Sequence, residues 1–526
     1  MKKVLSVVTV ALLFLLVSCT STPQSNARAY ITSITERSIE ASFRVEVKDP
    51  DKELDTRDFK VRIQKQGEDY KEQLVSLDQG QVKTVSFEGL SNETKYHITV
   101  LGTKNNKDIE LYFKENAITT KKQGDYKNDP IPVTTKEEFT KMDYQKHYVL
   151  KNDIDFQDSS ITPLFNSGSP FRGSFDGGNF TLKNIKLTNE NDVYKSYLSI
   201  FGYVSNATIE NLKVDNIHID NVEKPYIGIH YVSILVSKVA NNDFVMNNVE
   251  ISNSSIKVVH NLNQSTTNRN LYVGLAGASV QGTFSNITIN NSKIDVTQNG
   301  VNGTATGEQQ ATTGTYIGGA LGLVEQDKGK GIEKITVTDT EINLNVDQDK
   351  QALSKGLVYV GGIFGSYRSD RNTQELVTNA SITINHNKHE ETPDEKLDTL
   401  YVGGIAGSMI KSRLNNVVYS GNIILSVSDT LNRVYASLIS GTATTSSTKL
   451  LASGTILLTT TNGTQNASTF EIYPYTWVNK LLEVKVLSTA QITIDSNVID
   501  LSNYEVITNV NDLIDSQFVI SNYKAN

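Results

Sequence analysis

The segment Tyr359-Val360-Gly361-Gly362-Ile363-Phe364-Gly365 indicates the architecture of this chain, because variants of it recur along the sequence. Each variant starts with a tyrosine, and the other six are Tyr197–Gly202, Tyr231–Val236, Tyr272–Gly277, Tyr316–Gly322, Tyr401–Gly407 and Tyr435–Gly441. Consecutive tyrosines are separated by 34 to 44 residues. Self-similarity at such a period is typical of a repeat architecture, in which each unit buries its apolar face against its neighbours.

Short alternating strands fill the space between these phrases, for example Ile287–Ile289 with Ile294–Val296. We therefore expect each period to hold two coils of about 21 residues, and about 14 coils to form a rod of roughly 65 Å at the usual strand spacing. Side chains at equivalent inward positions of successive coils should be Ile or Val and should stack on one another, and Asn or Thr should lie at the corners. Glycine should supply positive φ at the corners and allow close approach of coils.

The phrase Tyr-Val-Gly-Gly-Ile-Xaa-Gly, followed by an Asn-containing strand, resembles the GLUG-type repeats of bacterial surface proteins. Upstream, Phe171–Leu182 is similar to the opening coil of that family. The resemblance implies an all-β fold with a right-handed parallel β-helix, or solenoid, over residues 131–465. A seven-bladed propeller has a similar period, but the chain has no Trp-Asp signature and only one Trp.

The N-terminus has the pattern of an export signal. Lys2 and Lys3 precede an apolar run that is too short to span a bilayer, and the run ends Leu16-Val17-Ser18-Cys19. This ending resembles the lipobox of bacterial lipoproteins, in which the cysteine is acylated. We expect residues 1–18 to be a lipoprotein signal peptide, Cys19 to carry lipid, and 19–27 to be a tether. The resemblance places the protein at the cell membrane, lipid-anchored and extracytoplasmic.

Residues 28–121 alternate apolar and polar side chains, as half-buried strands do, and predict an N-terminal β-sandwich. Within it, Phe87–Val100 resembles the late strands of a fibronectin type III domain, with Leu90 and Tyr96 at that family's conserved corner positions. Residues 122–130 are expected to be a linker.

Both ends of the solenoid need covers, because terminal coils expose unpaired strand edges. Thr135-Lys136-Glu137-Glu138 is a capping-box sequence and predicts a short helix over the first coil. Residues 466–526 should form the last coils and a cap, with a helical cover near Asn511–Phe518.

Composition excludes several classes of function. One Cys among 526 residues rules out disulfide frameworks and cysteine-rich metal sites, and it is assigned to the lipid. The formal net charge of −8 makes a phosphate-binding surface improbable, so we expect no nucleic-acid partner. No sequence motif points to a cofactor.

Candidate catalytic or metal-binding residues are sparse. Asp153, Asp155 and Asp176 form the best acidic group, where a weak calcium site is an alternative to solvated corner carboxylates. His386 and His389 lack the spacing of a zinc peptidase and are expected to lie in a solvated loop over 385–396. We therefore expect no metal site.

The tyrosines Tyr272, Tyr316, Tyr359 and Tyr401 are the candidate ligand-binding residues. If they point outward, two coils per period would place them about 10 Å apart, suitable for stacking on sugar rings. Inward or corner packing is the alternative, and the sequence leaves their direction open. Val360 and Ile363 cannot both face inward on one straight strand, so a bulge or corner must lie between them.

These features together predict a lipid-anchored extracytoplasmic binding or adhesion protein that presents a repetitive surface to glycans or to host and cell-surface proteins. The alternative is a glycan-degrading β-helix, a lyase or glycoside hydrolase. A cleft with three or more converging acids, or acids beside an Arg, would favour the enzyme.

Overall fold

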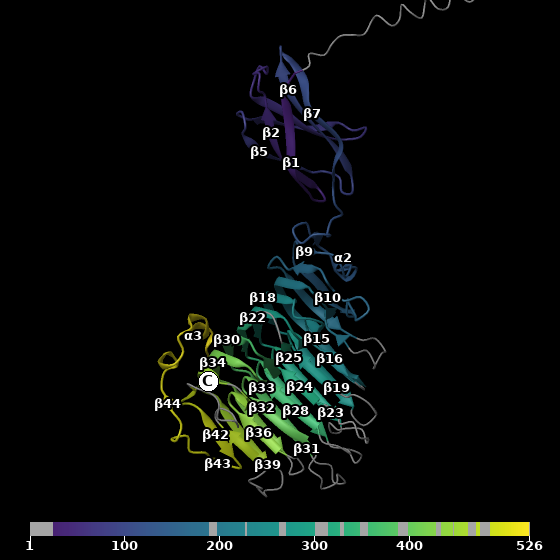
Figure 1. Ribbon diagram of the computed structural model, residues 1–526. Coiled ribbons are helices and arrows are strands. Elements are labelled where there is room, and N and C mark those ends of the chain that lie inside the picture. The colour runs from purple at the N-terminus through teal and green to yellow at the C-terminus, as the bar shows by residue number, and fades with distance from the viewer. Residues whose placement is uncertain are drawn as a thin grey trace, which may run out of the picture. The chain divides into compact units, whose positions relative to one another are not determined.

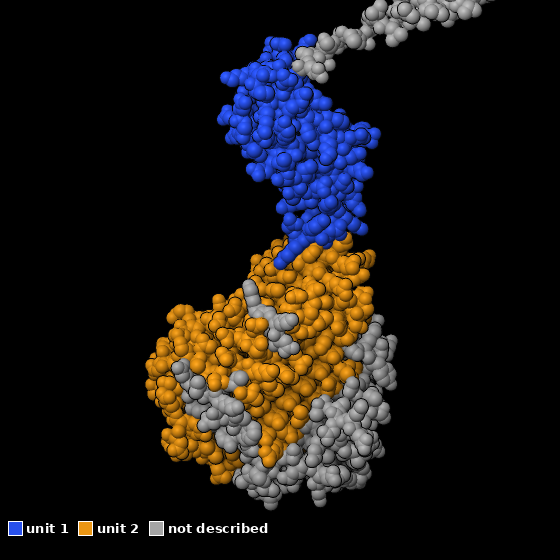
Figure 2. Space-filling model, in the orientation of Figure 1, with its two compact units in different colours: residues 1–129 blue, residues 130–526 orange. Residues whose placement is uncertain are grey.

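The computed structural model describes residues 25–188, 197–226, 229–261, 270–299, 314–326, 331–347, 356–387, 398–427, 433–444, 446–460, 470–473 and 484–524 (Figure 1). The expected signal peptide at residues 1–18, Cys19 and residues 20–24 of the expected tether lie outside this part of the chain. The chain divides into two compact units, residues 1–129 and 130–526 (Figure 2). The regular secondary structure of both units is almost entirely β-strand where they are described.

Unit 1 contains two antiparallel sheets that contribute to one core. The three-stranded sheet has the order β1 (Arg28–Glu36), β2 (Glu40–Lys48), β5 (Val82–Glu88). The four-stranded sheet has the order β4 (Tyr70–Ser76), β3 (Asp58–Lys65), β6 (Lys95–Lys104), β7 (Lys107–Thr119). Alternate residues of both sheets, such as Phe43 and Ile98, are fully buried in this core. Tyr96 is also buried, and its hydroxyl accepts a 2.7 Å hydrogen bond from the Ser91 amide.

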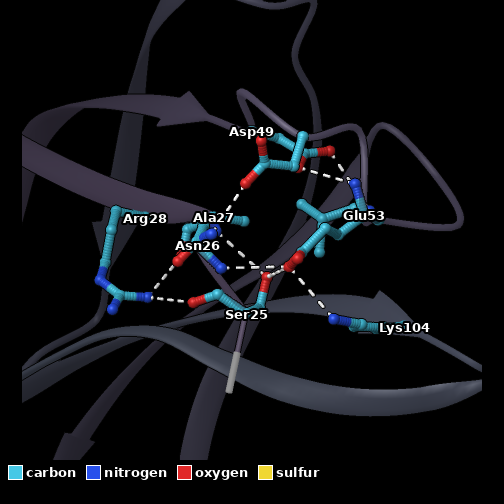
Figure 3. Close-up of polar contacts among 9 residues, drawn as sticks. Ser25, Asn26, Ala27, Arg28, Asp49, Glu53 and Lys104 are labelled. Atoms are coloured by element: carbon cyan, nitrogen blue, oxygen red, sulfur yellow. Dashed lines mark hydrogen bonds and ion pairs between the residues drawn. The ribbon is translucent and has the colours of Figure 1, made fainter. Parts of the chain in front are cut away.

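The first described residues are fixed to unit 1 by polar contacts (Figure 3). Ser25 Oγ donates a 2.5 Å hydrogen bond to Glu53 Oε2, and Lys104 Nζ contacts the same oxygen at 3.1 Å. The Ser25 hydroxyl and the Lys104 ammonium hold the pKa of Glu53 below its usual range. Ala27 is fully buried. The last three residues of the expected tether therefore belong to unit 1.

The expected linker at 122–130 is also attached to unit 1 over most of its length. The Asp129 carboxylate accepts hydrogen bonds from the Ser38 amide at 2.6 Å and the Ser38 hydroxyl at 2.8 Å. Asp129 is buried, so this turn is an ordered part of the unit.

Unit 2 is built from long parallel sheets, an arrangement compatible with a β-helix or solenoid. An eight-stranded sheet consists of β13 (Tyr197–Leu198), β16 (His230–Val232), β20 (Leu271–Gly274), β24 (Gly314–Gly318), β28 (Gly356–Gly361), β32 (Asp398–Gly403), β36 (Arg433–Ser437) and β40 (Phe470–Tyr473). A seven-stranded sheet consists of β14 (Phe201–Val204), β17 (Val236–Val239), β21 (Gly277–Val280), β25 (Leu321–Gln326), β29 (Phe364–Ser369), β33 (Ala406–Ile410) and β37 (Ser440–Ala443). Figure 1 shows β24, β28, β32 and β36 side by side.

The third sheet has 22 strands, most of them in two parallel series. One series is β18 (Val245–Ser252), β22 (Thr283–Asn290), β26 (Ile332–Thr338), β30 (Asn372–Thr378), β34 (Arg413–Tyr419), β38 (Thr448–Ala452), β41 (Val484–Leu487) and β44 (Val506–Ile507). The other is β19 (Ser255–Asn261), β23 (Lys293–Asn299), β27 (Glu341–Asp347), β31 (Ser381–Asn387), β35 (Asn422–Val427), β39 (Thr455–Thr460) and β42 (Gln491–Ile494). Both series start from the long strand β15 (Thr208–Tyr226).

The remaining strands of this sheet lie at its ends. They are β8 (Ile131–Val133), β9 (Tyr148–Leu150), β10 (Ile154–Ile161), β11 (Ser174–Asp176), β12 (Thr181–Leu187) and β43 (Asn497–Val498). Only β43 pairs antiparallel, with β42, among the described strands of unit 2.

We call the set of strands that one sequence period contributes a level, and the levels together the stack. The strand register places successive periods on directly adjacent levels, so the expectation of two coils per period is wrong. Tyr316 pairs with Tyr359, and Tyr359 pairs with Tyr401, in directly adjacent strands. Each level of about 42 residues contributes four strands, one to each of the four series. The longest parallel ladder, from β8 to β44, has 12 strands. At the usual strand spacing it measures about 53 Å, somewhat less than the expected length.

The corner expected between Val360 and Ile363 is confirmed. Strand β28 ends at Gly361 and β29 starts at Phe364, and both Val360 and Ile363 are fully buried. Gly362 is needed at this corner because an added Cβ would lie 2.1 Å from the Gly404 carbonyl oxygen. Glycine thus acts here through close approach of neighbouring levels.

The positive φ expected at repeat glycines is instead found at a column of polar residues. Its members share φ values between 53° and 60° and are Asn211, Asn248, Asn286, Lys334, Glu375, Asn416 and Lys449. Asn tolerates this left-handed conformation better than most residues. The kink interrupts alternation, so two consecutive side chains, such as Glu210 and Asn211, lie outside between buried Ile209 and Leu212.

The N-terminal cover is confirmed. Helix α2 (Lys136–Thr140) begins at Thr135, whose side chain accepts from the Glu138 amide in a capping box. Phe139 is fully buried and packs edge-on against Phe156, Phe175 and Phe201.

The C-terminal helical segment differs from expectation in where it packs. We call residues 509–524 the strap; it contains the 3-10 turn η2 (Val510–Asp512) and helix α3 (Gln517–Asn522). Helix α3 contacts β26, β30 and β34, and so lies on the side of the stack (Figure 1). The strap buries an outward column of Val377, Val418, Leu451 and Leu487 beneath Ile514 and Val519.

Candidate binding groove

The tyrosines form one continuous column of stacked rings. Its seven members are Tyr197, Tyr231, Tyr272, Tyr316, Tyr359, Tyr401 and Tyr435, with ring centroids 4.8 to 5.4 Å apart and ring planes within 16° of parallel. The expected spacing of about 10 Å is therefore wrong, because equivalent tyrosines lie on adjacent levels. Their flanking residues Val358 and Val360 point into the core, so the column lies on the outer side of its sheet.

Most of the ring surface in this column is already covered. Tyr272 is 8% exposed and Tyr435 is 5% exposed. Ala278 and Leu323 pack in one buried cluster with Tyr272. Burial raises the pKa of Tyr231 to about 12 and also raises the pKa of Tyr272 and Tyr359. Since each inner ring uses both faces on its neighbours, the column offers little face for sugar stacking.

The acidic group singled out in the sequence is occupied by local hydrogen bonds. Asp155 Oδ1 accepts from the Gln157 amide and from Asn184 Nδ2, both at 2.8 Å. Asp176 Oδ1 accepts from the Gly178 amide at 2.9 Å. Among the described residues, no three His, Cys, Asp or Glu side chains are grouped so that they could hold a metal ion.

His386 is a core residue, and the expected solvated loop does not begin at Asn385. It lies in β31 with 2% exposure, stacked in register between Val346 and Val427. Burial lowers its pKa to about 4. His389 lies outside the described residues.

The structure instead brings together a polar groove that runs along the stack. Two adjoining hollows, of about 740 and 570 Å³, share Asn372 and Gln374 in their lining. The larger extends toward β15 and the smaller toward β38. Together they form one lateral groove across seven levels, which we call the groove.

A column of polar side chains, one per level, forms the floor of the groove. In register order these are Glu210, Asn247, Ser285, Glu333, Gln374, Asn415 and Thr448. We call this set the floor column. Each member immediately precedes a residue of the positive-φ column, so the same kink that breaks alternation turns the floor column outward.

Hydrogen bonds between levels order the floor column. Ser285 Oγ donates to Asn247 Oδ1 at 2.8 Å, and Gln374 Nε2 donates to Glu333 Oε2 at 3.2 Å. Thr448 Oγ1 donates to Asn415 Oδ1 at 3.2 Å. The amide and hydroxyl groups are thus preoriented in rows.

Two different elements flank the floor column. On one side are turns that include Asn242, Asp243 and Ser447. On the other side the strap contacts the positive-φ column: Ser516 Oγ donates to Glu375 Oε1 at 2.5 Å, and Asp515 pairs with Lys449. The amide oxygen of Asn242 is buried, and no group among the described residues donates a hydrogen bond to it.

Charged groups in the groove are mostly acidic. Its described lining includes the carboxylates of Glu210, Asp243 and Glu333 and the guanidinium of Arg413. Glu210 and Glu333 are three register steps apart, or about 14 Å. Glycoside hydrolysis requires a carboxylate pair at about 5 to 9.5 Å. Glu210 and Glu333 are therefore too far apart to form such a pair.

Sequence reasoning missed the groove, although a signal was present. In several repeats an Asn or charged residue pair precedes an apolar strand, as in Glu210-Asn211 and Asn247-Asn248. Such pairs break strict alternation and mark two outward positions. Only the register shows that the first members of these pairs line up.

Comparison of the chain with protein-family models gives no match, and neither does comparison with curated proteins. No helix in the described residues combines the length and the apolarity that crossing a membrane requires.

Proposed function

We propose that this chain is a lipid-anchored extracytoplasmic binding or adhesion protein that holds an extended polymer, a glycan or a segment of a cell-surface protein, in the groove. In this proposal unit 2 is a right-handed parallel β-helix and unit 1 is a fibronectin type III-like spacer. The observation that carries the proposal is the floor column: one polar side chain per level, aligned in register over seven levels.

A repetitive groove suits a repetitive ligand for two physical reasons. The floor column stands on parallel ladders with a buried apolar core behind them, so little order is lost on binding. Many weak contacts along one chain also add up, since each further contact is intramolecular once the first has formed.

The membrane anchor is proposed from the sequence ending at Cys19. Ser25, the first residue held on unit 1, is six residues later, which allows a separation of at most about 20 Å. A lipid on Cys19 would therefore keep unit 1 close to the bilayer surface. The acidic net charge makes electrostatic attraction to anionic lipids unfavourable, so the acyl chains would carry the attachment.

Two measurements test this proposal. Cells expressing the full chain should incorporate radiolabelled palmitate into it and retain it in the membrane fraction, whereas Cys19→Ser should lose both. Residues 20–526 should retain ligands from a panel of glycans and cell-surface proteins, and Gln374→Arg should reduce retention while Thr383→Arg, on the neighbouring strand series, should not. Failure of every ligand to bind would refute the binding function.

A glycan-degrading enzyme is the second candidate, because three carboxylates and an arginine line the same groove. If the groove cleaves glycans, incubation with oligosaccharides should release shorter products, and Glu333→Gln should abolish that release. Intact oligosaccharides after prolonged incubation at micromolar protein would exclude this candidate.

A further inference from the structure

We infer that the groove takes a linear, uncharged, β-1,4-linked glycan that lies parallel to the stack, with one sugar opposite each level. This inference rests on the proposed binding function and names the ligand class of that site.

The first step is a match of repeat lengths. Equivalent side chains of the floor column advance by one strand spacing, about 4.8 Å per level. This advance is close to the length that one hexose adds to an extended β-1,4-linked chain. Seven floor positions therefore cover about 29 Å, or about six sugars.

The second step concerns the hydrogen-bonding groups. Asn, Gln and Ser side chains both donate and accept, as sugar hydroxyls do. Gln374 Nε2 donates to Glu333, and this contact leaves the amide oxygen of Gln374 as an acceptor for a ligand hydroxyl. Asn247 and Ser285 continue this row of donors and acceptors, and Ser285 Oγ donates to Asn247 Oδ1 at 2.8 Å.

The third step concerns charge. Three carboxylates and one guanidinium line the described groove, which gives it an acidic potential. A polyuronate would bring one negative charge opposite each level and would be repelled. An uncharged glycan avoids this repulsion and can donate its hydroxyl protons to the carboxylates, which accept strongly.

Calorimetric titration of residues 20–526 with defined hexasaccharides tests the inference. The probes are β-1,4-linked hexamers of glucose, N-acetylglucosamine and mannuronate, together with the matching trimers. We expect a neutral hexamer to bind at least tenfold more tightly than its trimer and than the mannuronate hexamer. Gln374→Ala and Asn247→Ala should each weaken binding of the neutral hexamer about tenfold.

Two controls make the outcome specific. Thr383→Ala removes a polar side chain from β31, on the neighbouring strand series, and should leave affinity unchanged. Glu333→Gln should raise the affinity for the mannuronate hexamer severalfold, because it removes a repelling charge while keeping the shape. Binding of mannuronate as tight as that of the neutral hexamers, or insensitivity to Gln374→Ala, would overturn the inference. Retention of a cell-surface protein without any glycan binding would overturn it while leaving the proposed binding function intact.

Discussion

At the scale of single residues, each repeat position accepts only side chains that suit its exposure and its backbone conformation. The floor column can be polar because it faces out, and the positive-φ column favours Asn because few other side chains adopt that conformation easily. The inward column that contains His386 mixes polar and apolar side chains, since His260 and Gln298 lie in register with Val346. His386 itself lies between Val346 and Val427 as a buried ionisable group.

His386 should make the stability of unit 2 depend on pH. Its pKa is about 4 in the folded chain and about 6.5 in the unfolded chain, so the unfolded state binds the proton first as pH falls. Stability is full above pH 6.5 and is lost progressively between pH 6.5 and pH 4. Urea unfolding should show a loss of about 2 kcal/mol between pH 7 and pH 5 that His386→Val removes. His97→Gln, in unit 1, is the control; a pH slope that persists in His386→Val would contradict this assignment.

At the scale of elements, adjacent levels pack through glycine corners and stacked tyrosines. A methyl group at Gly362 would meet the Gly404 carbonyl oxygen of the next level at 2.1 Å. The two levels cannot both keep their register and accommodate that atom, since the corner backbones are in direct contact.

Gly362→Ala should therefore lower the free energy of unfolding of unit 2 by about 3 kcal/mol, at the upper end of overpacking costs. Chemical denaturation followed by circular dichroism measures this change. Thr383→Ala, on an outward position of a nearby strand, should cost less than about 0.5 kcal/mol. Equal midpoints for the two variants would show that the corner can relax.

At the scale of the whole molecule, the strap ties the C-terminus to the side of the stack. Along the outward column the strap covers Thr336, Val377 and Val418, whereas Thr288 precedes it. Ion pairs hold the strap near its middle, Asp515 with Lys449, and at its last residue, Lys524 with Asp339. These lysines hold the pKa values of Asp515 and Asp339 below their usual range.

Val519→Asp should detach the strap, because it places a carboxylate in the fully buried centre of this contact. We expect cleavage after residue 508 by a nonspecific protease to accelerate at least tenfold, with increased binding of a hydrophobic dye to the uncovered column. Gln517→Asp, exposed on the first turn of the same helix, should behave like the parent chain. Resistance of Val519→Asp to the protease would mean that the strap is held by its other contacts.

The repeat period, the all-β class, the corner after Gly361 and the capping-box helix could all be predicted from the chain alone, because a recurring phrase, alternation and a cap are patterns along the sequence. Which repeats are adjacent depends on strand pairing in the folded chain: one period is one level, so Tyr316 and Tyr359 stack at 5.1 Å. The same register aligns Glu333 with Gln374 in the groove and places the strap on the side of the stack. Alternation specifies the face on which a side chain lies, but which side chain lies next to it depends on pairing between residues some 40 positions apart.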